Sequence, residues 1–218
     1  SGNGSGMSGL ININANGANS DLIVNDDLTT SGGDITLTAD DAIAFAAAAN
    51  VVSDGGNVLV RANQDAAAGD GIAVPATTAN SINMVDGSSI NSGTGSVTLR
   101  TDGADGGSIT SENITTANGT VTVNAETSVS INGPVVSGGA LVDIDAGTAV
   151  TSSAAGDITT TSGTADGASG NVDIDAGTDV TLVGDIITTG AVTNGDGGEV
   201  TIDTVAGDVT VGVIEASG

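Results

Sequence analysis

Val-Asp-Ile-Asp-Ala-Gly-Thr occurs twice in this chain, at Val142–Thr148 and again at Val172–Thr178. An identical string at two places indicates a repeat architecture, in which one small unit stacks on the next. Within the string, Val, Ile and Ala alternate with polar residues, which is the period of a β-strand with one buried face. The repeat therefore predicts short strands recurring along the chain.

The first part of the string, apolar-x-apolar, opens eight similar units. Their openings are Ile11-x-Ile13, Ile35-x-Leu37, Val58-x-Val60, Val97-x-Leu99, Val121-x-Val123, Val142-x-Ile144, Val172-x-Ile174 and Val200-x-Ile202, and their first residues are 24, 23, 39, 24, 21, 30 and 28 positions apart. Most units contain two further short apolar strands between polar turns, as at Val129/Ile131 and Val135. We predict an all-β fold, a right-handed parallel β-helix (β-solenoid) of about eight coils with three short strands per coil. An antiparallel sandwich also has short strands, but it does not predict near-identical units.

The composition agrees with a thin, layered core. The chain has one Phe, two Met, and no Trp or Tyr, so Val, Ile, Leu and Ala must fill the interior. Disorder is disfavoured because β-branched residues recur at strand spacing over the whole length. There is no Cys, so disulfides do not hold the fold together.

We expect residues 1–218 to form a single β-solenoid segment of a longer chain or filament, because the pattern approaches both ends without a polar cap. The longest step predicts a protruding insertion within residues 62–95. Two smaller insertions, Thr164–Ser169 and Ala191–Gly197, follow the third strand of their units and should lie one above the other. Insertions on one edge can mark a binding face, but tolerated drift in exposed turns is the more ordinary explanation.

The charge balance narrows the possible partners. Twenty-seven acidic residues against two Arg and no Lys give a net charge of −25, which repels nucleic acid and anionic lipid headgroups. The longest apolar run, Ala42–Ala49, is too short to span a membrane as a helix. We therefore expect no nucleic acid and no direct membrane insertion, and we expect cations or basic protein surfaces as counter-charges.

Residue inventory argues against catalysis. The absence of His, Cys, Lys and Tyr removes most general bases and activated nucleophiles. Arg61 and Arg100 occupy equivalent positions and should stack outward on adjacent coils. Polysaccharide lyases with a β-helical fold use acidic Ca²⁺ sites together with a basic residue, so these arginines raise the possibility of lyase chemistry. No aromatic platform for sugar rings accompanies them, so we expect no enzyme and no required cofactor.

One outward column contains both signs of charge. It runs through Asn14, Thr38, Arg61, Arg100, Asn124, Asp145, Asp175 and Asp203. Together with the neighbouring outward column, it places Asp143, Asp145, Asp173 and Asp175 in one patch, with about 5 Å between coils. Such a like-charge patch predicts either a weak surface Ca²⁺ site or a solvated acidic face.

Rows of Thr suggest a further alternative, a flat ice-binding ladder. Thr29, Thr115, Thr159 and Thr188 each follow an apolar residue of a third strand and are expected to form one row. Thr is also a favoured strand residue, which explains such a row without any ligand.

Four segments carry a resemblance to a known family. Gly-Asp-Ile-Thr-Leu-Thr-Ala at 33–39, Gly-Ser-Val-Thr-Leu-Arg-Thr at 95–101, Gly-Thr-Val-Thr-Val-Asn-Ala at 119–125 and Gly-Asp-Ile-Thr-Thr-Thr-Ser-Gly at 156–163 resemble repeats of filamentous-haemagglutinin-like exoproteins and autotransporter adhesin passengers. The resemblance implies a bacterial cell-surface or secreted protein used for adhesion or extracellular filament formation. The partners it implies are further copies, another surface protein, or a glycan or receptor on a host or neighbouring cell; the alternative function is a cation-dependent glycan- or receptor-binding module.

Overall fold

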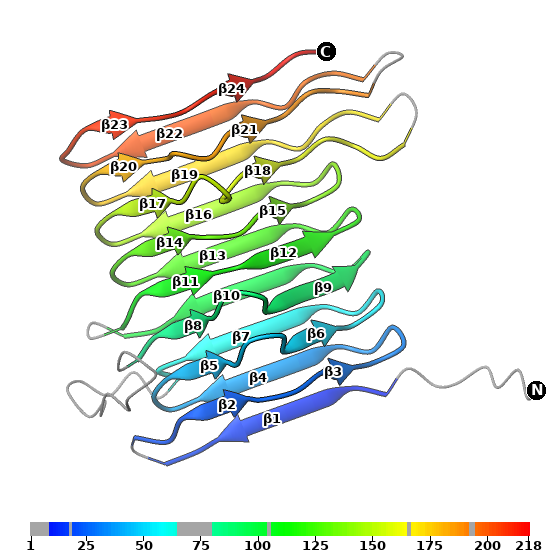
Figure 1. Cartoon of the computed structure of the whole chain (residues 1–218), viewed down its shortest axis with the longest axis vertical. Coiled ribbons are helices and arrows are strands. Elements are labelled where there is room, and N and C mark those ends of the chain that lie inside the picture. Colours follow the sequence, from blue (N-terminus) through cyan, green and yellow to red (C-terminus); the bar gives the residue numbers. More distant parts are fainter. Residues whose placement is uncertain (1–8, 18, 65–79, 104–105, 165–166, 192–194) are drawn as a thin grey trace, which may run out of the picture.

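The computed structural model describes residues 9–17, 19–64, 80–103, 106–164, 167–191 and 195–218. They form 24 strands in three sheets of eight, and no helix lies among the described residues. The chain visits the three sheets in turn, so each strand pairs in parallel with its counterpart one coil later (Figure 1). The predicted parallel β-helix of about eight coils with three strands per coil is confirmed.

The strand bounds follow the three sheets. Sheet A contains β1 (Ile11–Ala15), β4 (Ile35–Ala39), β7 (Val58–Ala62), β10 (Val97–Thr101), β13 (Val121–Ala125), β16 (Val142–Ala146), β19 (Val172–Ala176) and β22 (Val200–Thr204). Sheet B contains β2 (Leu22–Val24), β5 (Ile43–Phe45), β8 (Ile82–Met84), β11 (Ile109–Ser111), β14 (Val129–Ile131), β17 (Val150–Ser152), β20 (Val180–Thr181) and β23 (Val209–Thr210). Sheet C contains β3 (Leu28–Thr29), β6 (Asn50–Val52), β9 (Ser89–Gly93), β12 (Asn113–Thr116), β15 (Val135–Val136), β18 (Ile158–Thr159), β21 (Ile186–Ile187) and β24 (Ile214–Glu215). Each of the eight predicted openings begins a strand of sheet A.

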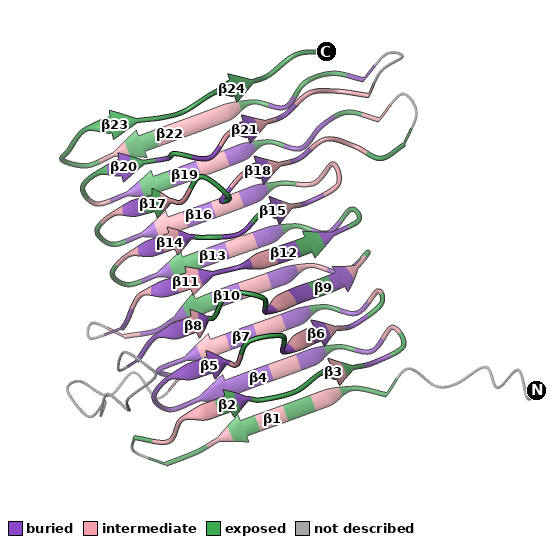
Figure 2. Ribbon diagram, in the orientation of Figure 1, coloured by how far each residue is buried: buried purple, intermediate pink, exposed green. Residues whose placement is uncertain are grey.

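The core is a stack of thin layers rather than one wide interior. Alternate residues of every inner strand point inward and are almost fully buried, such as Ile35, Leu37 and Val97 at 0% exposure. The largest side chain, Phe45 on β5, is buried beside its register partner Met84 on β8. Burial decreases at both ends of the stack because an end coil is covered on one side only (Figure 2). Coil-on-coil stacking therefore supplies the hydrophobic stabilisation.

A column of small residues brings the coils together where sheet C turns into sheet A. It consists of Gly9, Gly33, Gly56, Gly95, Gly119, Ala140, Gly170 and Gly198, each two residues before a strand of sheet A. A Cβ added to Gly119 would lie 1.8 Å from the carbonyl oxygen of Gly95, and one added to Gly198 would lie 1.9 Å from that of Gly170. Most of these positions need glycine because the carbonyl of the preceding coil occupies the space of a side chain.

Buried hydroxyl groups fasten the same corner. Each hydroxyl donates a hydrogen bond to the carbonyl of the small-residue column, two positions before the next sheet A strand. The donors are Thr30, Ser53, Ser92, Thr116, Ser137, Thr160 and Thr188. In the regular coils this acceptor lies three residues ahead, whereas Thr160 reaches Gly170 at 2.6 Å and Thr188 reaches Gly198 at 2.8 Å. The coil therefore closes in the same way whether or not residues are inserted at this corner.

The predicted insertion within residues 62–95 is narrower than that range. Strands β8 and β9 lie inside it and belong to the regular coil. The extra residues fall between β7 and β8, where 65–79 lie outside the described residues.

Candidate functional site

The mixed-charge column lies on the outer face of sheet A. The second and fourth residues of each sheet A strand point outward, and the register joins Thr38 to Arg61, Arg61 to Arg100, Arg100 to Asn124 and so on to Asp203. The predicted outward stacking of Arg61 and Arg100 on adjacent coils is confirmed. The same register pairs Asp143 with Asp173 and Asp145 with Asp175.

The four aspartates form a repulsive patch. Burial raises the pKa of Asp143, and the carboxylates of Asp145, Asp173 and Asp175 raise it further. Burial also raises the pKa of Asp175, followed by repulsion from Asp173, Asp145 and Asp203. The folded chain thus holds these charges at a cost that a bound cation or protonation would relieve.

The register does not by itself assemble a metal-ligand shell. Across the part of the chain that the structure describes, no three acidic side chains gather closely enough to hold a metal ion. Asn124 instead donates to Asp145, with 3.2 Å between Nδ2 and Oδ2. Calcium binding at Asp143, Asp145, Asp173 and Asp175 stays a prediction.

A groove runs along the corner where sheet A turns towards sheet B. Its volume is about 510 Å³, and its acidic lining residues are Glu126, Asp145, Asp175 and Asp203. Small residues of the repeated string, including Gly147 and Gly177, also line it. A Cβ on Gly177 would lie 2.0 Å from the carbonyl oxygen of Gly147, so this corner also requires glycine.

Sequence reasoning missed this groove. Its signal was the Ala-Gly pair before the final Thr of both copies of the repeated string, because small residues beside an acidic column leave room at a corner. The arrangement can hold an extended cationic group by charge and shape, with carboxylates at about 4.8 Å intervals.

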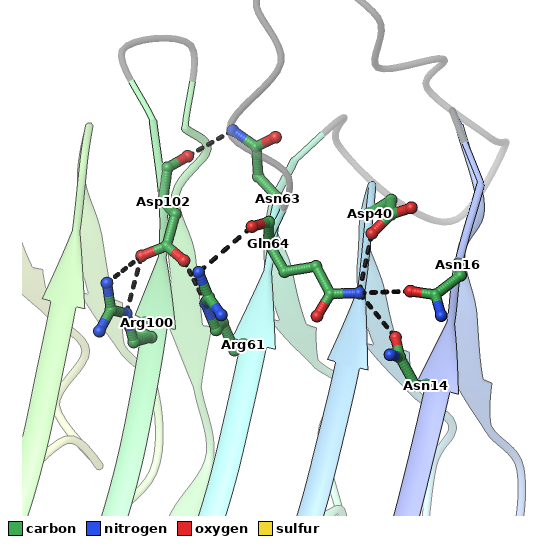
Figure 3. A network of polar contacts seen from close by, with 8 residues as sticks. All are labelled: Asn14, Asn16, Asp40, Arg61, Asn63, Gln64, Arg100 and Asp102. Atoms are coloured by element: carbon green, nitrogen blue, oxygen red, sulfur yellow. Dashed lines mark hydrogen bonds and ion pairs between the residues drawn. The ribbon is translucent and has the colours of Figure 1, made fainter.

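The two arginines belong to a polar network across the first four sheet A strands (Figure 3). Arg61 and Arg100 both bind the carboxylate of Asp102, and Arg100 Nε lies 2.7 Å from Asp102 Oδ1. The side chain of Asp102 is 9% exposed, against 35% for Arg61 and 49% for Arg100. Among the described residues, one buried carboxylate thus binds two guanidinium groups, both of which remain partly exposed.

The network continues across the coils through Gln64. Its Nε2 lies 2.6 Å from Asn14 Oδ1, 2.8 Å from Asn16 Oδ1 and 2.8 Å from Asp40 Oδ1. Arg61 reaches the carbonyl of Gln64 at 3.2 Å. The chain leaving β7 is therefore held against the two preceding coils, immediately before the residues outside the described part.

The two smaller insertions lie one above the other, as predicted. Ser169 N donates to the carbonyl of Asp196 at 2.9 Å, and Ala191 N donates to that of Gly167 at 3.2 Å. Thr161 and Thr189 also approach each other, with 3.2 Å between their hydroxyl oxygens. The described residues of the two insertions thus continue the coil-on-coil stacking; residues 165–166 and 192–194 lie outside the described part.

The expected row of Thr residues is wrong at its last member. Thr159 pairs with Ile187, whereas Thr188 is fully buried and closes its coil. The sequence places Ile186 and Ile187 side by side, and Ile186 is the one that enters the core. A continuous outward Thr ladder, as needed for ice binding, is therefore not formed there.

Comparisons of the chain with models of protein families, with curated proteins and with solved structures find no match. None of the described residues forms a helix that is both long and apolar enough to cross a membrane.

Proposed function

We propose that the chain is a non-enzymatic structural or adhesive β-solenoid of a bacterial cell-surface or secreted protein, and that it contributes to an extracellular fibre by end-to-end stacking or as part of a giant adhesin. The observation that carries this proposal is the character of the last described coil. Val209 is 47% exposed and Ile214 is 42% exposed, whereas their register partners Val180 and Ile186 are at 0% and 1%. A further coil placed on β22, β23 and β24 would bury this apolar row as inner coils do.

The opposite end presents a matching edge. Ile11, Ile13 and Leu22 are only partly buried, and β1, β2 and β3 are the outermost strands of their sheets. Open strand edges with an apolar inner row are templates for further pairing. Because every internal pair is parallel, a second copy would dock head to tail, with its β1–β3 on β22–β24 of the first.

Sedimentation velocity over a range of concentrations tests this stacking. The wild-type chain is expected to form species that grow with concentration, and Val209→Lys combined with Ile214→Lys is expected to leave the monomer. Val183→Lys is the matched control, because Val183 is 58% exposed but lies between β20 and β21. A wild-type chain that stays monomeric at every concentration would refute stacking between copies.

The corner groove favours a second candidate, a cation-dependent glycan- or receptor-binding module. Its carboxylates could bind Ca²⁺, which in turn could bind sugar hydroxyl or carboxylate groups. Calorimetric titration with Ca²⁺ should then give a saturable heat that Asp145→Asn combined with Asp175→Asn removes, with Asp208→Asn as the control. A signal with no saturation, or one unaffected by the double substitution, counts against this candidate.

A further inference from the structure

The outer face of sheet A contains both cations of a chain whose net charge is −25. Two copies of so acidic a protein repel each other over most orientations. A charge-complementary contact between copies must therefore use Arg61 and Arg100. Both are accessible, at 35% and 49% side-chain exposure, and among the described residues the carboxylate they bind is that of Asp102.

The matching acidic positions lie on the same column. Asp145 and Asp175 follow two and three coils after Arg100, with Asn124 between Arg100 and Asp145. The order along the axis is thus Arg61, Arg100, Asn124, Asp145 and Asp175, one per coil. This order is self-complementary about Asn124, because reversing it places each cation opposite an anion.

We propose that two copies pair face to face through sheet A, related by a two-fold axis that passes beside Asn124 and runs along the strand direction. This operation reverses the coil order and keeps each outward column opposite itself. Arg100 then faces Asp145 of the second copy, Arg61 faces Asp175, and Asn124 faces Asn124. Symmetry doubles the two ion pairs to four, as isologous interfaces require.

Side-chain lengths fit this arrangement. Packed sheets lie roughly 10 Å apart, a gap that a long Arg opposite a short Asp can span and that two Asn side chains can nearly close. The opposite arrangement, with both stacks running the same way, would place Arg opposite Arg and Asp opposite Asp, which is repulsive. Charge therefore selects the antiparallel pairing of stacks.

This pairing is independent of end-to-end stacking, because it uses the outer face of sheet A rather than the end coils. The experiments are therefore done in the Val209→Lys/Ile214→Lys background as well as in the wild-type chain. They are done with a metal chelator at about 0.15 M salt, where the Debye length is about 8 Å and long-range repulsion is reduced. A fibre defect and a pairing defect can then be told apart.

The decisive experiment is a charge swap. Arg100→Asp alone and Asp145→Arg alone should each weaken the homodimer by about tenfold or more, because each creates two like-charge contacts. An equimolar mixture should restore dimerisation, because the heterodimer again places opposite charges together at both contacts. Sedimentation equilibrium of each chain and of the mixture measures this. A mixture no better than the separate chains would overturn the proposal.

A cross-linking experiment leaves the ion pairs intact and so does not depend on the folding of the charge variants. The chain has no Cys, so Asn124→Cys introduces a single thiol. A bifunctional thiol reagent that spans roughly 10 Å should join two copies at Asn124→Cys but not at Asp203→Cys, whose counterparts would be about 29 Å apart. Equal cross-linking at both positions, or none at Asn124→Cys in dimeric protein, would contradict the axis.

Discussion

Substituting Gly119 by Ala tests whether the coils approach each other as closely as the small-residue column requires. The added Cβ would lie 1.8 Å from the carbonyl oxygen of Gly95 and 2.9 Å from the amide nitrogen of Ser96. Relief needs a local separation of more than 1 Å, towards an ordinary contact of about 3.4 Å. That separation strains the neighbouring bond from Val97 N to the carbonyl of Thr120, which is 2.9 Å long.

The expected cost combines three terms. Overpacking costs about 1–3 kcal/mol, and a weakened intercoil hydrogen bond costs about 1 kcal/mol. The loss of chain entropy in the unfolded state returns about 0.4–1 kcal/mol. We expect Gly119→Ala to lower the free energy of unfolding by about 1–4 kcal/mol.

Urea unfolding followed by far-ultraviolet circular dichroism measures this, since the chain has no Trp or Tyr to report by fluorescence. Gly9→Ala is the matched control, because Gly9 begins the same column and an added Cβ there meets nothing within 4 Å. The control should change stability by less than about 0.5 kcal/mol. Equal effects of the two substitutions would refute the steric account of the column.

Three further predictions concern charge and hydrogen bonding. The pKa values of Asp143 and Asp175 are raised above the ordinary 3.8 in the folded chain, so their ionised carboxylates destabilise the fold at neutral pH, and this penalty is relieved as pH falls through the raised values. Asp143→Asn combined with Asp175→Asn should therefore raise stability at neutral pH and flatten the pH dependence of urea unfolding. An unchanged profile would count against the repulsion. Thr160→Val should cost about 1–2 kcal/mol by leaving the Gly170 carbonyl without its hydroxyl donor, whereas Thr159→Val on the outer face should be nearly neutral; equal thermal melts for the two would be contrary to this. Asp102→Asn should lower stability by about 1–2 kcal/mol because Arg61 and Arg100 lose their shared carboxylate. The control is Asp196→Asn at an exposed position. Equal melting temperatures for the two variants would contradict a stabilising role of the Asp102 carboxylate.

The strand openings could be predicted from the sequence because every coil must bury apolar side chains at the same inward positions of its sheet A strand. The residues at the positions of Val121 and Val123 face inward on coil after coil, so the apolar-x-apolar alternation was visible without a structure. The stacking of Arg61 on Arg100 followed from their equivalent place, one residue after the second apolar position of each opening. Where two apolar residues adjoin, as at Ile186 and Ile187, alternation alone could not decide which one points inward.

Features that depend on pairs of distant residues were harder to predict. Asp102 could be recognised from the sequence only as part of a turn, and its role as the shared partner of two arginines depends on how that corner folds. The corner groove depends on the space left by Ala-Gly pairs on adjacent coils. The glycine column was present in the sequence, but its cause, the carbonyl of the preceding coil, becomes visible only with the coil spacing.

Electron microscopy of the purified wild-type chain tests the central claim, that its end coils accept further coils, most directly. Eight coils at about 4.8 Å each give a stack of roughly 40 Å. Stacking predicts rods of several times that length, shortened to single stacks by Val209→Lys combined with Ile214→Lys and unaffected by Val183→Lys. Particles that remain single stacks at every concentration would contradict the claim.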